Sequence, residues 1–401
     1  MKASLLGGGN MVDYKRLEQL KLLMEEEIQK GIVMGSAIRV LHNNKVVYEE
    51  GVGYGCKETN TLIKNDTIYR MYSMSKPVTA VASMILYERG MLGLLDPVSM
   101  YLEGFKNQKV LTKDGLVDVN REATISDLLN MTSGVVYPDL NMEAGVYMVN
   151  LYDNVTRERK EGNYIDTITL CNRIGKEPLE FHPGERWRYG ASADILGAVI
   201  EVVSGKSFYN FLNDEIFKKL GMVDTSFYVP EDKLNRFAEI YEYKENTKQL
   251  EPCTWSHLGL NDFKSKPEFE SGGAGLVSTI EDYSKFALML LNGGTYNGVK
   301  ILGSKTMEYL KKPQLRGEKA TYKDWPSMNG YEYGNLMRYL TDQTAAATSA
   351  SEGIFGWDGW TGNYFFVDPK ENLVMLYMVQ NVNGTNTRLI NKLQAVIYSA
   401  L

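Results

Sequence analysis

The feature that most constrains the fold is a pair of strand-forming segments at opposite ends of the 401-residue chain. Residues 36–55, SAIRVLHNNKVVYEEGVGYG, hold two β-branched runs on either side of a His-Asn-Asn turn, which predicts a hairpin. Residues 363–381, NYFFVDPKENLVMLYMVQN, hold two apolar runs joined by a polar turn at residues 368–372. Strands at both ends with helices between them indicate one sheet built from both termini.

Helical patterns fill most of the remaining chain. Residues 12–31 carry leucines among charges and end at a glycine, as an amphipathic helix does. Residues 387–401 are helical again, and helical patterns dominate between residues 76 and 205. A polar stretch near residues 150–163 interrupts them, and we expect a loop there. The fold class is therefore α/β (α+β), with a mostly helical domain inserted into a sheet domain.

We expect the sheet domain to consist of residues 12–72 together with 271–401. The helical domain then covers residues 73–270, and residues 1–11 form a loose tail.

Charge and composition exclude several classes of protein. A formal net charge of -6 argues against a nucleic-acid surface, since phosphate binding needs clustered Lys and Arg. No run of about 18 apolar residues is present, so we expect no membrane span. Three scattered cysteines (Cys56, Cys171 and Cys253) predict no disulfide framework and favour a reducing, cytoplasmic location.

The stretch MYSMSKPVTA, residues 71–80, places Ser73 three residues before Lys76 at the start of an apolar helix. Pro77 fits the first turn of that helix, where its missing N–H costs nothing. Residues three apart share a helix face, so the Lys76 amine can approach the Ser73 hydroxyl. A serine nucleophile needs such a base to take its proton. On spacing alone, however, a serine cap beside a solvated lysine is the commoner arrangement.

Other motifs that carry chemistry are missing from the sequence. The three histidines, His42, His182 and His257, have neither zinc spacing nor a Gly-x-Ser-x-Gly elbow to pair with, and we expect surface or packing roles for them. The glycines of GVGYGC lack the third glycine of a dinucleotide fingerprint, and no complete Gly-x-x-x-x-Gly-Lys-Ser/Thr loop occurs, because Gly205-Lys206-Ser207 has Ile200 in place of the first glycine. We therefore expect neither a metal nor a cofactor.

Five motifs, in order along the chain, resemble those of one superfamily. They are YSMSKPVTA (72–80), TISDLLNMTSG (124–134), FHPGERWRYGASADILGAVIEVVSG (181–205), SGGAGLVSTIEDYSKFALMLLNGG (271–294) and FGWDGWTGNYFFVDP (355–369). Together they resemble the serine β-lactamase and penicillin-binding-protein superfamily, and most closely the class C β-lactamases and their carboxylesterase relatives. The resemblance implies an antiparallel sheet flanked by N- and C-terminal helices, with the active site at the interface of the two domains.

The resemblance also implies a role for each matching position. Ser73 and Lys76 match the nucleophile and its lysine, and Tyr189 matches the tyrosine of the second motif. The implied oxyanion hole is formed by the backbone N–H groups of Ser73 and Trp360. The third motif, implied to bind substrate, falls on Trp357, Asp358 and Gly359.

Departures from the β-lactamase pattern narrow the expected substrate. Ala191 stands where the second motif usually has asparagine, so it offers no amide to an acylamino side chain. The third motif lacks its lysine, and we expect Asp358 to repel the carboxylate of a β-lactam. Trp357, Trp360 and Tyr364 suggest an apolar pocket, although ordinary core packing explains these rings equally well.

The residue types themselves explain how Ser73 loses its proton. A phenol and an amine both have an ordinary pKa near 10. Placed together in a half-buried site, a lysine cation favours phenolate, whereas desolvation favours the neutral amine. Because the two groups titrate as a coupled pair, the proton acceptor stays open between Lys76 and Tyr189.

We therefore expect a serine hydrolase that acts through an acyl-enzyme, most simply a carboxylesterase on small or medium esters with weak or no β-lactamase activity. One alternative is an amidase or peptidase on D-amino-acid or small-peptide substrates, in which Asp358 would bind an ammonium group. An alternative of another class is a penicillin-binding sensor that is acylated without turnover. The expected partner is a small ester or amide, and the natural substrate and oligomeric state stay open.

Overall fold

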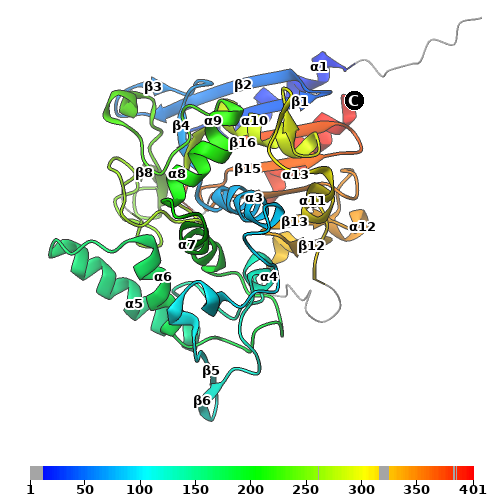
Figure 1. The fold of residues 1–401 in the computed structure, drawn as a ribbon. Coiled ribbons are helices and arrows are strands. Elements are labelled where there is room, and N and C mark those ends of the chain that lie inside the picture. Colours follow the sequence, from blue (N-terminus) through cyan, green and yellow to red (C-terminus); the bar gives the residue numbers. More distant parts are fainter. Residues whose placement is uncertain (1–11, 261, 316–324, 383, 385) are drawn as a thin grey trace, which may run out of the picture.

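The computed structural model describes residues 12–401 except 261, 316–324, 383 and 385 (Figure 1). The strands of its main sheet are β1 (Gly35–His42), β2 (Lys45–Cys56), β3 (Thr61–Leu62), β12 (Tyr331–Gly334), β13 (Met337–Leu340), β14 (Phe355–Asp358), β15 (Tyr364–Asp368) and β16 (Leu373–Val379). Within the described residues these eight strands form an antiparallel sheet in the order β12-β13-β14-β15-β16-β1-β2-β3. Because β1 pairs with β16, the prediction of one sheet built from both termini is confirmed.

Asparagines at the turns explain the two predicted hairpins. Asn43 and Asn44 join β1 to β2 with positive φ angles of 50° and 64°, a conformation that asparagine tolerates better than most residues. Asn372, between β15 and β16, has a φ of 47°. Both hairpins are therefore present where the sequence predicts them.

Side chains alternate along the strands between two separate cores. In β16, Leu376 and Met378 face one core, whereas Met375 and Tyr377 face the other. The first face is covered by α10 (Ile280–Leu291), and the second by the terminal helices α1 (Tyr14–Leu17), α2 (Gln19–Gln29) and α13 (Thr387–Ser399). The predicted N-terminal and C-terminal helices are thus confirmed, the former with a break at Glu18.

The inserted part of the chain is mostly helical. Its helices are α3 (Ser75–Glu88), α4 (Ile125–Leu129), α5 (Glu143–Lys160), α6 (Thr167–Lys176), α7 (Ser192–Ser204), α8 (Phe208–Leu212) and α9 (Lys218–Leu220). Short paired strands accompany them: β4 (Ile68–Arg70) with β9 (Val277–Thr279), β5 (Lys109–Thr112) with β6 (Gly115–Asp118), β7 (Tyr241–Lys244) with β8 (Gln249–Pro252), and β10 (Thr295–Tyr296) with β11 (Val299–Lys300). Two short helices, α11 (Ser304–Leu310) and α12 (Gln343–Ala346), precede β12 and β14.

The loop expected near residues 150–163 is wrong, because most of this stretch belongs to α5. The helix buries Met148, Leu151, Tyr152 and Val155 along one narrow stripe, together with Ala144 and Gly145 in its first turn, and most of its other residues are exposed. A helix with so narrow an apolar stripe reads as polar in the sequence. In Figure 1, α5, α6 and the β5–β6 hairpin extend from the molecule on the side away from the main sheet.

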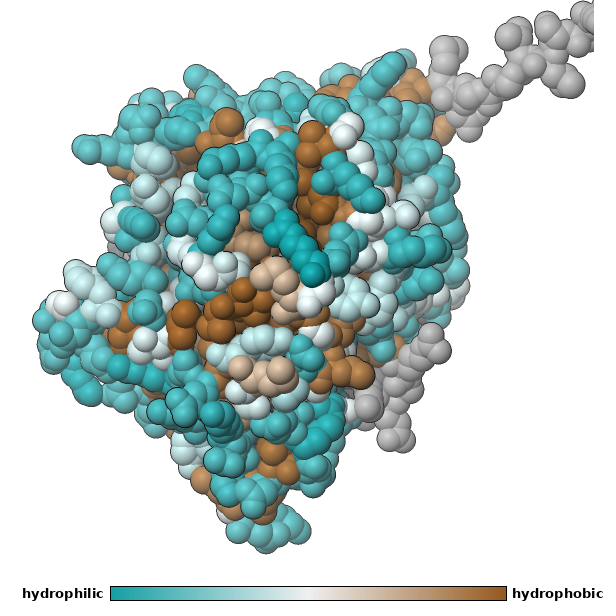
Figure 2. All heavy atoms as spheres, in the orientation of Figure 1, coloured by the Kyte–Doolittle hydropathy of each residue, from teal (hydrophilic) through white to brown (hydrophobic). Residues whose placement is uncertain are grey.

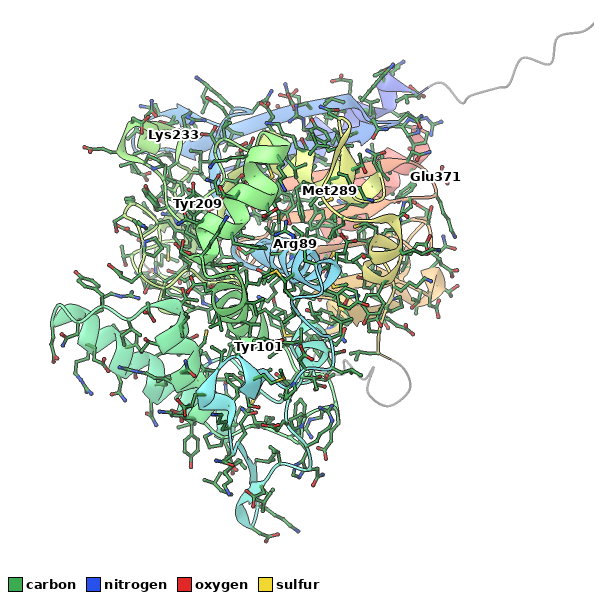
Figure 3. The ribbon with its side chains drawn as sticks, in the orientation of Figure 1. Arg89, Tyr101, Tyr209, Lys233, Met289 and Glu371 are labelled. Atoms are coloured by element: carbon green, nitrogen blue, oxygen red, sulfur yellow. The ribbon has the colours of Figure 1, made fainter. Side chains whose placement is uncertain are left out.

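The helix α3 lies at the centre of the molecule. Every residue from Ser75 to Leu86 is buried, and α3 packs against α7, so the prediction of a buried central helix is confirmed. Figure 3 shows Arg89, the residue after α3, in the middle of the visible face. Most of this face is hydrophilic, and an apolar patch lies in its middle, over α7 (Figure 2).

Membrane-spanning potential can be judged for the described residues. Among them, no single helix combines the length and the apolar content needed to cross a membrane. Ser192–Ser204 and Phe208–Leu220 meet the criteria of length and composition only when taken together as a bent pair.

A buried asparagine ties the turn after β14 to the strand that precedes Ser73. Asn363 Nδ2 donates to the Arg70 carbonyl at 2.8 Å, and its Oδ1 accepts from the Val379 N–H at 2.9 Å. Gln380 Nε2 donates to the same Arg70 carbonyl at 3.1 Å. Because buried backbone groups need partners, these bonds hold the β14–β15 turn beside the start of α3.

Candidate active site

Ser73 lies in the 3₁₀ turn η1 (Tyr72–Met74) that leads from β4 into α3. The residue before it, Tyr72, has a φ of 44°, a left-handed conformation that bulky side chains rarely adopt. Such strain costs on the order of 1–3 kcal/mol and persists only where packing enforces it. The buried Tyr72 ring meets those of Phe263 and Trp360 edge-on, at 5.9 and 5.1 Å between centroids. This packing holds the backbone that presents Ser73.

The Lys76 amine lies at the centre of the site and contacts residues from three parts of the chain. Its Nζ donates to Ser73 Oγ at 3.1 Å, to the Tyr137 hydroxyl at 3.0 Å and to the Gly273 carbonyl at 2.8 Å. The side chain is 0% exposed. Burial lowers the pKa of Lys76 to about 7, although the negative charges of Asp194 and then Asp358 oppose this shift. An amine with such a pKa is available in its neutral form near neutral pH.

Tyr189 lies just before α7 and faces the same amine. Lys76 Nζ is 4.6 Å from the centroid of the Tyr189 ring. The hydroxyl accepts a hydrogen bond from Trp357 Nε1 at 3.2 Å and shares one with Ser73. Burial raises the pKa of Tyr189 above its usual range, opposed by the hydrogen bonds with Ser73 and Trp357. The structure thus brings Ser73, Lys76 and Tyr189 together, and their catalytic roles stay predictions.

A second tyrosine, Tyr137, belongs to the site and escaped the sequence analysis. Its hydroxyl accepts from Lys76, and its ring lies edge-on to that of Tyr189 at 5.8 Å. Burial raises the pKa of Tyr137 well above its usual value, which favours the neutral phenol. Its place three residues after the motif at 124–134 was the available signal, but the chain has 26 tyrosines and nothing distinguishes this one by spacing.

The turn expected to supply an oxyanion donor lies beside the turn that carries Ser73. A Cβ atom on Gly359 would lie 2.6 Å from the Met71 carbonyl oxygen, so the two backbones touch at this point. The next residue, Trp360, contacts the Tyr72 ring. This arrangement suits an oxyanion hole built from the N–H groups of Ser73 and Trp360, and that assignment stays a prediction.

The structure does not bring Asp358 to the nucleophile. Trp357 faces the core that contains α3, whereas Asp358 pairs with Tyr364 in the register of β14 and β15 and faces α13. There it forms an ion pair with Arg338, with Nη2 to Oδ2 at 3.2 Å. Asp358 therefore lies on the α13 side of the sheet with its own counter-charge. Its charge still acts on Lys76, but the expected repulsion of anionic substrates by direct contact has no geometric basis.

The other expected binding residues take different positions. Ala191 is 0% exposed at the start of α7. Trp357 is almost fully buried, and its ring stacks on Tyr189 at 5.6 Å. Of the three rings expected to form an apolar pocket, Trp360 lies at the site, Trp357 supports Tyr189, and Tyr364 faces the other side of the sheet.

Three rings form what we call the aromatic wall: Trp255, His257 and Trp360. The backbone N–H of Trp360 is also the expected oxyanion donor. His257 stacks on Trp360 at 4.2 Å with an interplanar angle of 9°, and Trp255 meets Trp360 edge-on at 5.3 Å. Burial, and then the charge of Lys76, lower the pKa of His257 to about 4, so its ring is neutral at pH 7. Trp255 is 46% exposed. Neither Trp255 nor His257 belongs to a sequence motif that would mark it as part of the site.

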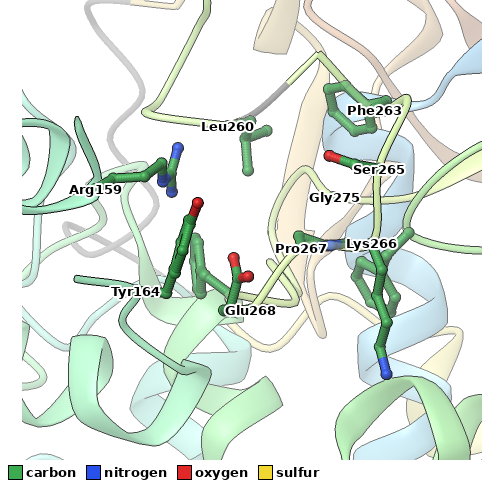
Figure 4. A pocket seen from close by; sticks show the side chains of 11 residues that line it. Arg159, Tyr164, Leu260, Phe263, Ser265, Lys266, Pro267, Glu268 and Gly275 are labelled. Atoms are coloured by element: carbon green, nitrogen blue, oxygen red, sulfur yellow. The ribbon is translucent and has the colours of Figure 1, made fainter. Parts of the chain in front are cut away.

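A cavity of about 400 Å³ lies near the site (Figure 4). Its described lining consists of Arg159, Tyr164, Phe227, Leu260, Phe263, Ser265, Lys266, Pro267, Glu268, Phe269 and Gly275. Phe263 links it to the Tyr72 ring, but none of these lining residues is Ser73, Lys76 or Tyr189. The lining of this cavity therefore includes none of the three expected catalytic residues.

Metal ligation has no basis in the part of the chain that the structure describes. No group of three or more His, Cys, Asp or Glu side chains there is arranged to hold a metal ion. The three cysteines are free thiols.

Comparisons with known proteins identify the family of the chain. The model of the Beta-lactamase family matches residues 20–398. Esterase EstB of Burkholderia gladioli is 25% identical over 395 residues, which cover 95% of each chain. Protein Rv1367c of Mycobacterium tuberculosis is 27% identical over 369 residues, covering 89% of this chain and 88% of that protein.

Solved structures of similar fold include EstCE1, described as a hydrolase with promiscuous acyltransferase activity. It superposes with a TM-score of 0.81 at 24% identity, over 96% of this chain and 99% of EstCE1. Simvastatin synthase LovD of Aspergillus terreus superposes with a TM-score of 0.80 at 20% identity, over 96% and 98% of the two chains. Both likenesses confirm the expected fold. Because the family model spans nearly the whole chain, the protein belongs to the Beta-lactamase family, within the superfamily of serine β-lactamases and penicillin-binding proteins.

Proposed function

We propose that this protein is a carboxylesterase that hydrolyses small or medium neutral esters through an acyl-enzyme on Ser73. The observation that carries the proposal is the hydrogen bond of 3.1 Å between the fully buried Lys76 amine and the Ser73 hydroxyl. The similarity to esterase EstB supports esters as the substrate class.

Lys76 is the better proton acceptor of the two candidates. Burial favours the neutral form of both side chains, which makes the lysine a base but keeps the tyrosine a phenol. A neutral Lys76 amine can accept the Ser73 proton directly, whereas Tyr189 would first have to lose its own. Tyr189 instead orients the Ser73 hydroxyl, and its own hydroxyl is held by a hydrogen bond from Trp357 Nε1.

The reaction then follows in two halves. Ser73 Oγ attacks the ester carbonyl carbon while Lys76 Nζ takes the hydroxyl proton. The oxyanion is stabilised by the N–H groups of Ser73 and Trp360, and a typical donor of this kind is worth about 3 kcal/mol. The bond to the alcohol oxygen breaks as that oxygen takes the proton from Lys76. Water repeats the sequence on the acyl-enzyme, which releases the carboxylic acid and restores Ser73.

The substrate class follows from what surrounds the nucleophile. The aromatic wall next to the expected oxyanion donor is uncharged at pH 7, because its histidine is neutral. Its exposed ring, Trp255, offers an apolar surface that suits a flat or apolar group of a neutral ester. Weak or no β-lactamase activity is expected, since the buried Ala191 has no amide for an acylamino side chain.

The geometry does not favour either alternative function, the amidase or peptidase or the penicillin-binding sensor. An amidase that binds an ammonium group at Asp358 has lost its basis, since Asp358 faces away and pairs with Arg338. A sensor that is acylated without turnover differs from an esterase in its kinetics, because it shows one burst and no steady state.

Replacement of the nucleophile tests the proposal. Ser73→Ala should abolish steady-state hydrolysis of p-nitrophenyl butyrate and labelling by a fluorophosphonate, while circular dichroism stays unchanged. The matched control is Ser83→Ala, a buried serine of α3 whose hydroxyl donates to the Thr79 carbonyl. Substantial turnover by the purified Ser73→Ala protein would show that another residue carries the reaction.

The pH dependence tests Lys76 as the base. A lysine whose pKa is lowered to about 7 is protonated, and hence inactive as a base, below that pH and neutral above it. We expect kcat/KM for a neutral ester to rise through an acidic limb near pH 7. Lys76→Arg should lose activity at every pH, because arginine stays protonated. A flat profile down to about pH 5 would contradict the assignment.

The aromatic wall predicts selectivity between esters. Trp255→Ala should raise KM for phenyl acetate about twofold to thirteenfold, since a ring contact is worth about 0.5–1.5 kcal/mol, and should hardly change KM for ethyl acetate. Tyr164→Ala is the control, because Tyr164 is also exposed but lines the cavity of Figure 4. A larger effect of Tyr164→Ala would place the substrate in that cavity.

A further inference from the structure

The segment 271–276, Ser-Gly-Gly-Ala-Gly-Leu, is a sequence motif that the proposed reaction leaves without a role. It lies against α3, on the side where Lys76 is buried. Lys76 Nζ donates to the Gly273 carbonyl at 2.8 Å, and Thr79 Oγ1 donates to the Gly272 carbonyl at 2.7 Å. Successive turns of α3 thus bond to successive carbonyls of the segment.

Asp194, in the first turn of α7, holds the same segment from the other side. Its Oδ1 accepts from the Ser271 hydroxyl and from the Gly273 N–H, the latter at 2.9 Å. The carboxylate is 2% exposed and lies where the helix dipole favours negative charge. Gly273 is therefore bonded through its N–H to Asp194 and through its carbonyl to Lys76.

The absence of a side chain at Gly273 allows this close approach. A Cβ atom there would lie 2.7 Å from the Tyr137 hydroxyl and 2.9 Å from Asp194 Oδ2. Real Cβ atoms essentially never come so close to other heavy atoms. The glycine thus lets a carboxylate, a phenol and the Lys76 amine share one buried space.

We propose that Asp194, acting through residues 271–275, is a positioning residue for Lys76. It fixes the carbonyl that aims the amine at Ser73, and it supplies the buried negative charge that accompanies the protonated amine. The inference rests on the proposed function, because it concerns the same serine and lysine.

The electrostatics agree with this geometry. The charge of Asp194 is the largest influence that opposes the fall in the Lys76 pKa caused by burial. Burial raises the pKa of Asp194 itself, and the hydrogen bond from Ser271 and the charge of Lys76 oppose that shift. Asp358 is the other group whose charge acts on Lys76. The charge of Asp194 in turn acts on the titratable side chains of Tyr137, Tyr152, Cys171 and Tyr189, and the charge of Lys76 acts on His257.

The test is the pH dependence of Ser73 labelling by a fluorophosphonate, which needs no knowledge of the natural ester. Asp194→Asn keeps a hydrogen-bond acceptor but removes the charge, so the neutral amine should persist to lower pH. The acidic limb of the labelling rate should therefore move down by roughly 1 pH unit. Ser271→Ala is a milder variant, because it removes a hydrogen bond that favours the charged form of Asp194. The Asp194 carboxylate is then protonated more readily, and the limb should move in the same direction by less.

Asp282→Asn is the matched control. Asp282 also lies in the first turn of a helix, is 2% exposed, and accepts from a hydroxyl (Thr225) and a backbone N–H (Asp224). Its variant should leave the limb in place.

The outcomes separate the two proposals. If the wild-type protein labels at Ser73 but neither Asp194→Asn nor Ser271→Ala moves the limb downward, the role of Asp194 is overturned while the serine hydrolase assignment stands. If the wild type does not label at all, the proposed function fails first. If circular dichroism shows that Asp194→Asn does not fold like the wild type, the result with Ser271→Ala decides whether Asp194 positions Lys76.

Discussion

The burial of one amine organises this site. Lys76 lies inside a helix that is buried on all sides, and its Nζ finds three oxygens in place of water. Burying an ammonium group is expensive unless it is paired and hydrogen-bonded, and the commonest relief is a lowered pKa. The same desolvation that costs folding free energy therefore turns an ordinary lysine into a base next to Ser73. A solvated lysine at the same spacing would stay protonated at pH 7.

The three oxygens and the expected oxyanion donor come from distant parts of the chain, so the main sheet has to hold them together. β16 connects the C-terminal half to β1, and Asn363 fastens the β14–β15 turn to the residue at the end of β4. On the other side, Tyr189 lies just before α7, and Asp194 lies in the first turn of that helix. The N-terminus of α3 lies between the β14–β15 turn and the start of α7. The Ser-x-x-Lys pair therefore depends on a sheet that is built from both ends of the chain.

Much of the fold could be predicted because its signals are local. The Asn43-Asn44 turn, the two C-terminal strands and the apolar α3 are all readable from neighbouring residues. The face on which a residue lies depends instead on strand register, and so Asp358 was expected to meet the substrate although it faces α13. Tyr137 and His257 reach the site through tertiary packing alone, and no spacing in the sequence marks them.

We propose that Ser73 carries an acyl group during turnover, with Lys76 as its base. Intact-protein mass spectrometry after rapid acid quench of the wild type with p-nitrophenyl butyrate can detect this intermediate. We expect an added butyryl mass that maps to the peptide containing Ser73, that decays as the ester is consumed, and that is absent from Ser73→Ala. Steady turnover without any adduct on that peptide, or an adduct on another residue, would contradict it.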